Sequence, residues 1–209
     1  MPIKLNKSLM NKDCRLTEVK IKKNLKAEIY DNCLPLPIFF TMREIIMGMG
    51  FPWFYGKKIV EKGYDVPSPI KGYENNEKAC QFAHGFLAEE TYNWSNQTQH
   101  IVPILNVIKP RAWLRVKANL ALQEEKSLVH GWHYDMVHGK KKKIPYQDSI
   151  TGVLHFTTNN GYTLMETGQK VESIENRLVL FPNNILHTGM RQTDKPVRVL
   201  LNFNFFASL

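Results

Sequence analysis

The sequence predicts a mainly β protein with flanking α-helices, in which two sheets lie face to face and helices of the N-terminal half brace them. Two observations lead to this prediction. Residues 111–206 contain a series of short strand-like segments separated by turn signals such as Asn159-Asn160-Gly161. Residues 1–110 are cut into short pieces by prolines and glycines and include two segments with helical spacing of apolar residues. Many short strands after a more helical half are typical of a double-sheet fold.

Two helices are predicted in the N-terminal half. The first spans residues 41–49, with Thr41 as N-cap and Glu44 three residues later, which is the pattern of a capping box. The second spans residues 75–92, where apolar side chains recur at helical spacing. We expect residues 1–110 to form a helical and irregular support for a β core at residues 111–206. Because 209 residues is an ordinary length for one domain, we expect residues 1–209 to form a single domain.

The strands of the C-terminal half are expected at residues 113–122, 132–137, 149–157, 162–166, 169–174, 177–181, 185–190 and 197–206. The first and last of these segments are amphipathic. Segment 113–122 gathers Arg115, Lys117 and Asn119 on one face, and segment 197–206 gathers Arg198, Leu200, Asn202 and Asn204. Such strands fit a sheet that packs on helices with its apolar face and lines a polar cavity with the other, or one whose polar face meets water.

Composition excludes several classes of protein. Hydrophobic residues make up 43% of the chain and aromatic residues 11%, which rules out a disordered, collagen-like or coiled-coil chain. The sequence has no apolar run long enough for a transmembrane helix, and the start Met-Pro-Ile-Lys-Leu-Asn-Lys does not resemble a secretory signal. The 3 cysteines are widely spaced and predict neither a disulfide framework nor a zinc ribbon. We therefore expect a cytoplasmic location.

The chain carries a net charge of +9, from 28 Lys and Arg against 19 Asp and Glu. Such a charge favours acidic partners. Most of the excess is spread along the chain, but residues 140–143 form one run of lysines. A solvated loop is the usual interpretation of such a run, and contact with nucleic acid or an acidic substrate is the alternative.

One group of residues indicates metal chemistry. His133 and Asp135 are two positions apart in a predicted strand, so their side chains project on the same face. A pair cannot hold a metal alone. A third ligand from another strand would complete a two-His-one-carboxylate triad and leave three positions open on octahedral Fe(II). His187, in Asn184-Ile-Leu-His-Thr-Gly189, is the candidate, and Arg198 follows it on the next predicted strand.

The order of His133-x-Asp135, His187 and Arg198 resembles the signature of the Fe(II)/2-oxoglutarate-dependent oxygenases. The resemblance covers about residues 111–206 and extends to small oxygenases of phage. Three further stretches are similar to the prolyl-hydroxylase-like branch of that superfamily: Thr163-Leu-Met-Glu-Thr-Gly168, Glu175-Asn-Arg-Leu-Val-Leu-Phe-Pro182 and His187-Thr-Gly189.

This resemblance implies a double-stranded β-helix, or jelly roll, with Fe(2+) at its open end. It implies His133, Asp135 and His187 as the catalytic metal ligands. It also implies that Arg198 pairs with the distal carboxylate of 2-oxoglutarate, for which a guanidinium offers a planar fork of donors.

Further cosubstrate contacts are expected from the two amphipathic strands. Prolyl hydroxylases usually place a tyrosine before the His-x-Asp motif to contact the cosubstrate, whereas this chain offers Lys117 and Asn119 there. Asn202 shares the polar face of Arg198 and is a fourth candidate for cofactor binding. Arg115 lies on the same face as Lys117, where it either approaches the cavity or forms a salt bridge at its rim.

The implied activity is that of a dioxygenase that consumes 2-oxoglutarate and dioxygen, hydroxylates a peptide, amino acid or small metabolite, and releases succinate and CO2. One alternative is an oxidative demethylase of nucleic acid, which would need stacking aromatics beside a basic groove. No aromatic residue interleaves the lysines at 140–143. Another alternative is a non-catalytic jelly-roll binding module. Such a module does not need an open iron site, so the intact His/Asp/His/Arg set favours the enzyme.

Overall fold

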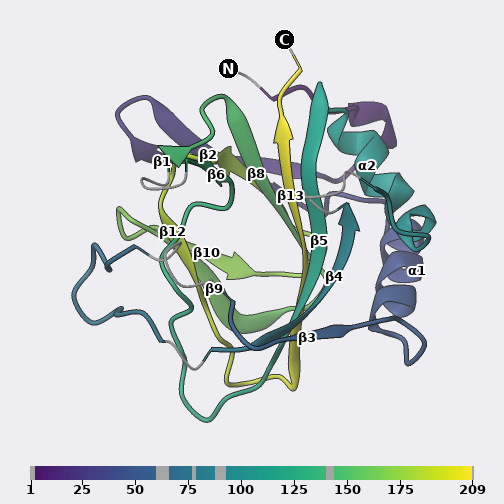
Figure 1. Ribbon diagram of the computed structural model, residues 1–209. Helices are drawn as coiled ribbons and strands as arrows, with labels where there is room; N and C mark the ends of the chain where they lie inside the picture. Colours follow the sequence, from purple (N-terminus) through teal and green to yellow (C-terminus); the bar gives the residue numbers. More distant parts are fainter. Residues whose placement is uncertain (1–2, 60–65, 77–78, 88–92, 140–143, 209) are drawn as a thin grey trace.

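A computed structural model describes residues 3–59, 66–76, 79–87, 93–139 and 144–208 of the chain (Figure 1). The described residues are mostly in strands. In chain order their elements are η1 (Lys7–Leu9), β1 (Arg15–Lys22), β2 (Leu25–Asp31), α1 (Leu36–Met47), β3 (Phe54–Gly56), β4 (Gln81–Leu87), η2 (Thr98–Ile101), α2 (Val102–Ile108), β5 (Ala112–Leu122), β6 (Val137–His138), β7 (Ile144–Pro145), β8 (Ser149–His155), β9 (Asn159–Met165), β10 (Lys170–Ser173), β11 (Leu178–Pro182), β12 (His187–Met190) and β13 (Val197–Phe206).

Two antiparallel sheets lie face to face, and β6 and β7 form a separate two-stranded ribbon. The large sheet has eight strands in the order β1-β2-β11-β8-β13-β5-β4-β3, and the small sheet has the order β10-β9-β12. Figure 1 shows the small sheet opposite β5, β8 and β13 of the large one. The predicted mainly β fold, a double-stranded β-helix with flanking helices, is confirmed.

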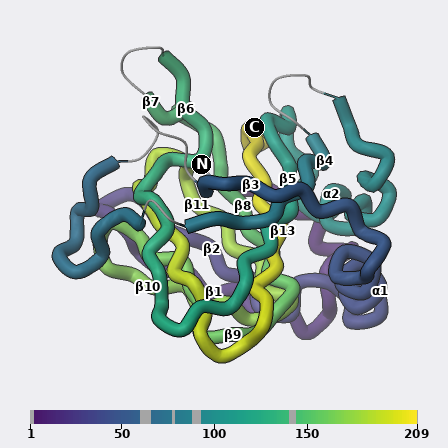
Figure 2. Tube along the Cα trace, turned by 60° about the horizontal axis from the view of Figure 1, so that its bottom comes forward, coloured from purple at the N-terminus to yellow at the C-terminus, as the bar shows by residue number. Residues whose placement is uncertain are grey.

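The two helices cover the outer face of the large sheet. Figures 1 and 2 both place α1 and α2 together on the side of β5 and β13 that faces away from the small sheet. Val116 of β5 is paired with Phe203 of β13, and both are fully buried in a core that includes Phe39 of α1 and Ile104 of α2. Burying one such large apolar side chain stabilises the fold by about 1.5–3 kcal/mol.

The opposite face of β5 and β13 lines the space between the two sheets. Lys117 is paired with Asn202, and Asn119 with Leu200, and all four line one cavity between the sheets. The prediction that these strands pack on helices with one face and line a polar cavity with the other is therefore confirmed.

The helix predicted at residues 41–49 exists but begins earlier. α1 spans Leu36–Met47, with Pro37 in its first turn, where a missing N–H costs no hydrogen bond. Thr41 is therefore not the N-cap. It lies inside the helix, and its Oγ1 donates a hydrogen bond of 2.9 Å to the carbonyl oxygen of Pro37. No helix in the described ranges is long and apolar enough to cross a membrane.

The prediction of a helix at residues 75–92 is wrong. Residues 81–87 form β4, which pairs with β3 on one side and β5 on the other. Phe82 and Phe86 are four residues apart, which fits one face of a helix as well as one face of a strand. The main-chain hydrogen bonds to β5 favour the strand. The second helix is instead α2, at Val102–Ile108, with Pro103 in its first turn.

Residues 1–110 contribute more strand than the sequence indicated. The hairpin of β1 and β2 extends the large sheet beyond β11, and β3 and β4 extend it beyond β5. By contrast, residues 132–137, which were predicted to form a strand, are largely irregular. They make isolated bridges, Trp132 to Val66 and His133 to His187, before the short strand β6.

Candidate metal and cosubstrate site

Two histidines and one aspartate converge at one end of the cavity. His133 and Asp135 lie in the irregular segment before β6, and His187 is the first residue of β12. His133 and His187 exchange two main-chain hydrogen bonds, of 3.0 and 3.2 Å, which hold the segment against the small sheet. One potential ligand atom of each of the three residues lies within 4.8 Å of the others. The structure thus brings together the three residues that the sequence singled out.

Both imidazoles turn the same nitrogen toward Asp135. Nδ1 of His133 lies 2.7 Å from the carbonyl oxygen of Gly131, and Nδ1 of His187 lies 3.0 Å from that of Ile185. A carbonyl oxygen can only accept, which assigns the proton of each neutral ring to Nδ1. Nε2 of His133 then lies 3.6 Å from Oδ1 of Asp135, and Nε2 of His187 lies 3.8 Å from Oδ2. The Nε2 lone pairs are therefore directed where a metal ligand needs them.

Asp135 is buried, with 4% of its side chain exposed, and three donors surround it. Arg115 Nη2 donates to Oδ1 at 3.1 Å. Asn202 Nδ2 and Asn204 Nδ2 donate to Oδ2 at 3.0 and 3.2 Å. Arg115 thus forms a salt bridge with a residue that lines the cavity but does not line the cavity itself, which favours the salt-bridge alternative that the sequence left open.

The environment keeps Asp135 ionised and His187 neutral. Burial by itself would raise the pKa of Asp135, but the two neighbouring imidazoles and the charge of Arg115 hold it well below its usual range. Burial lowers the pKa of His187 to about 4, and the charge of His133 acts in the same direction. A carboxylate and a neutral imidazole are the forms that bind a metal ion.

Arg198 lies in the same cavity and is 4% exposed. Its Nε donates to Ser173 Oγ at 2.7 Å, whereas its Nη2 is buried without a hydrogen-bond partner among the described residues. Burial, and then the charge of Arg191, lower the pKa of Arg198 to about 10, so the guanidinium still carries its charge at neutral pH. A buried cation with an unpaired N–H is a suitable site for an anion.

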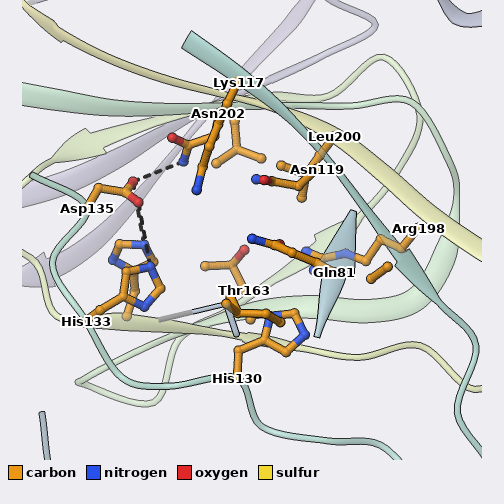
Figure 3. A pocket seen from close by; sticks show the side chains of 15 residues that line it. Gln81, Lys117, Asn119, His130, His133, Asp135, Thr163, Arg198, Leu200 and Asn202 are labelled. Atoms are coloured by element: carbon orange, nitrogen blue, oxygen red, sulfur yellow. Dashed lines mark hydrogen bonds and ion pairs between the residues drawn. The ribbon is translucent and has the colours of Figure 1, made fainter. Parts of the chain in front are cut away.

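The remaining cavity wall is polar. Figure 3 shows Lys117 and Asn119 pointing into the space between the triad and Arg198. Burial, and then the charge of Arg115, lower the pKa of Lys117 to about 7. Asn119 Oδ1 is buried without a hydrogen-bond partner in the described part of the chain. The cavity measures about 80 Å³, several times the space that one water molecule requires.

The sequence-predicted cofactor contacts differ in their surroundings. Arg198, Lys117, Asn119 and Asn202 all line the cavity, but the amide of Asn202 is occupied by Asp135 and Arg115. The lysine run at residues 140–143 lies outside the described residues.

Sequence reasoning missed two residues of the site, Asn204 and Ser173. Asn204 was placed on the correct face of β13 but was given no role. Ser173 carried no signal, because only the fold brings it beside Arg198. His130 lines the cavity, with its Nε2 buried and without a partner among the described residues.

Comparison with known proteins shows what this architecture is similar to. No family model matches the chain, and no curated protein matches its sequence. Among solved structures, an oxidoreductase of the 2OG-Fe(II) oxygenase family from Burkholderia pseudomallei matches with a TM-score of 0.52 at 11% identity, over 81% of this chain and 78% of that one. This chain has the fold of a 2OG-Fe(II) oxygenase.

Two other solved structures match at lower TM-scores. HygX from Streptomyces hygroscopicus, with nickel and 2-oxoglutarate bound, matches with a TM-score of 0.48 at 10% identity, over 88% of this chain and 83% of that one. A collagen prolyl hydroxylase from Paramecium Bursaria Chlorella virus-1 matches with a TM-score of 0.43 at 13% identity, over 77% of this chain and 100% of that one.

Proposed function

We propose that the chain is an Fe(II)- and 2-oxoglutarate-dependent dioxygenase that hydroxylates a peptide, amino acid or small metabolite and releases succinate and CO2. One observation carries the proposal. Two imidazole nitrogens and one carboxylate open onto a cavity whose other end holds a buried, incompletely paired arginine. The likeness of fold to the Burkholderia oxygenase supports the same reaction class.

The donor set fits the proposed metal. Two neutral imidazoles and one carboxylate are the ligands of a facial triad, which suits Fe(II) and leaves three positions for other ligands. His133, Asp135 and His187 would be these ligands and hence catalytic. The carbonyl oxygens that accept from the two Nδ1 atoms keep both rings in the required tautomer.

The opposite end of the cavity fits the proposed cosubstrate. Arg198 would bind the distal carboxylate of 2-oxoglutarate, because the side chain lines the cavity and its Nη2 is a buried donor without a partner among the described residues. Lys117 and Asn119 would contact the cosubstrate between Arg198 and the metal, and Asn202 would act on it indirectly, through Asp135. The bound metal and 2-oxoglutarate supply the oxidation of a C–H bond, while these side chains orient them and limit access of water.

Other parts of the proposal rest on the sequence. The net charge of +9 favours an acidic substrate but does not distinguish a peptide from a small molecule. We also propose that residues 1–209 act as one domain, since β1 to β4 join the sheet that carries Arg198. The widely spaced cysteines support a cytoplasmic location.

Succinate release tests the proposal. Purified protein is supplied with Fe(II), 2-oxoglutarate and air, and it is screened against pools of peptides, amino acids and oligonucleotides. We expect succinate above background, stimulated by one peptide or small-molecule pool and abolished in His187→Ala. His138→Gln is the matched control, because His138 is exposed. Stimulation by oligonucleotides alone would favour the demethylase, and the absence of any succinate with every pool would contradict the proposal.

A further inference from the structure

Arg115 makes more contacts around Asp135 than a simple ion pair requires. Its Nη2 donates to Asp135 Oδ1 at 3.1 Å and to Asn202 Oδ1 at 3.3 Å, and its Nε donates to Asn204 Oδ1 at 3.0 Å. Each asparagine in turn donates its Nδ2 to Asp135 Oδ2. Arg115 therefore contacts the carboxylate directly and also fixes which end of each amide faces it.

These bonds occupy most of the carboxylate. An ionised carboxylate has about four lone-pair positions, two on each oxygen. Asn202 and Asn204 fill both positions on Oδ2, and Arg115 fills one on Oδ1. The one remaining position is on Oδ1. This oxygen lies 3.6 Å from Nε2 of His133, while Oδ2, whose positions are filled, lies 3.8 Å from Nε2 of His187.

We propose that Arg115 is a positioning residue that, together with Asn202 and Asn204, makes Asp135 a one-oxygen metal ligand through Oδ1. This inference rests on the proposed function, because it concerns the metal of that site. A carboxylate that bound through both oxygens would take a fourth coordination position. The clamp of Arg115, Asn202 and Asn204 would leave three positions of a bound metal ion open for other ligands.

The clamp requires the shape of arginine as well as its charge. A guanidinium donates from Nε and Nη2 in a rigid plane, so one side chain reaches Asp135 and both asparagines at once. A lysine at this position would keep the positive charge but would lose the fork. Comparison of the two therefore separates positioning from an electrostatic effect.

Titration with Co(II), followed by visible absorption, tests the clamp without any turnover. Partners of metal ligands usually contribute about 10- to 100-fold to metal affinity. In Arg115→Lys we expect Co(II) to bind more weakly by about that factor, with an altered absorption spectrum at saturation. Asn202→Ala, which removes one donor without a change of charge, should alter the spectrum in the same direction. Arg111→Lys is the control, because Arg111 is exposed and contacts the Phe206 ring, outside the cavity.

The outcomes are distinguishable. Wild-type affinity and spectrum in Arg115→Lys would overturn the clamp and assign the effect of Arg115 to its charge. If Arg115→Lys does not fold, Asn202→Ala decides, and a wild-type spectrum in that variant overturns the clamp. Wild-type protein that binds no Co(II) would overturn the proposed function and the clamp together, and this result appears before any variant is made.

Discussion

Arg198 and Ser173 lie in different sheets and are joined by a 2.7 Å hydrogen bond, donated by Arg198 Nε to Ser173 Oγ. The bond links the guanidinium to the opposite sheet, and Nη2 is left without an acceptor in the described part of the chain. A buried donor without a partner costs about 1–3 kcal/mol, which a bound anion would recover. This arrangement supports the proposal that an anion binds at this end of the cavity.

The first prediction concerns that anion. Arg198→Ala should weaken 2-oxoglutarate binding by about 10- to 100-fold, the effect of losing a charge-assisted hydrogen bond, and should abolish turnover. Arg198→Lys should retain a little activity, since it keeps the charge but not the fork. Co(II) binding should survive in both variants. Equilibrium titration of the Co(II)-loaded protein with 2-oxoglutarate measures the effect, and full affinity in Arg198→Ala would refute the assignment.

The second prediction concerns the glycine that makes room for Arg198. A Cβ at Gly161 would lie 2.9 Å from the main-chain oxygen of Met190 and 3.1 Å from Cδ of Arg198. Because the main-chain atom cannot move alone, Gly161→Ala should cost about 1–3 kcal/mol of unfolding free energy, measured by urea denaturation. Gly85→Ala is the control, because a Cβ there meets nothing within 4 Å. Equal stability of the two variants would show that β9 can shift without cost.

The parts of the site that lie on regular strands could be predicted from sequence. Alternation in β13 places Arg198, Asn202 and Asn204 on one face whatever the strand pairs with, because the side-chain period is fixed. The two-residue separation of His133 and Asp135 likewise predicted that their side chains lie together, even though their segment is irregular. The metal triad needed only the further assumption that His187 faces the same cavity.

Contacts set by pairing between distant strands could not be predicted. The sequence around Arg115 does not indicate that it contacts Asn204, and the sequence around Ser173 does not indicate that it contacts Arg198. Both pairs depend on strand order and register. Residues 81–87 show the same limit, because a helical spacing of apolar residues was overridden by main-chain bonds to β5. The N-terminal hairpin of β1 and β2 was missed although Thr17, Val19 and Ile21 alternate with charged residues, because this alternation is short and much of β1 is exposed.

The third prediction concerns metal removal. A ligand that binds only the folded state at 100 times its Kd stabilises that state by about 2.7 kcal/mol. For a chain of this size, saturating Co(II) should therefore raise the Tm by roughly 5–10 °C, and EDTA should reverse the change. Asp135→Asn should show no such shift. Equal shifts in wild type and Asp135→Asn, measured by calorimetry, would place the bound metal elsewhere.

The fourth prediction concerns Lys117 and follows from its pKa of about 7, which burial and the charge of Arg115 lower and the charge of Asp135 partly restores. Only the neutral amine is a nucleophile, so its reactivity should rise about tenfold per pH unit below 7 and level off above it. With a small acylating reagent at pH 7, mass spectrometry should therefore find Lys117 modified before the exposed Lys12, although Lys117 is half-buried. A labelling rate at Lys117 that continues to rise steeply from pH 8 to pH 10 would contradict the lowered pKa. In that case the amine would stay charged at neutral pH, and Lys117 would meet the cosubstrate as a full cation.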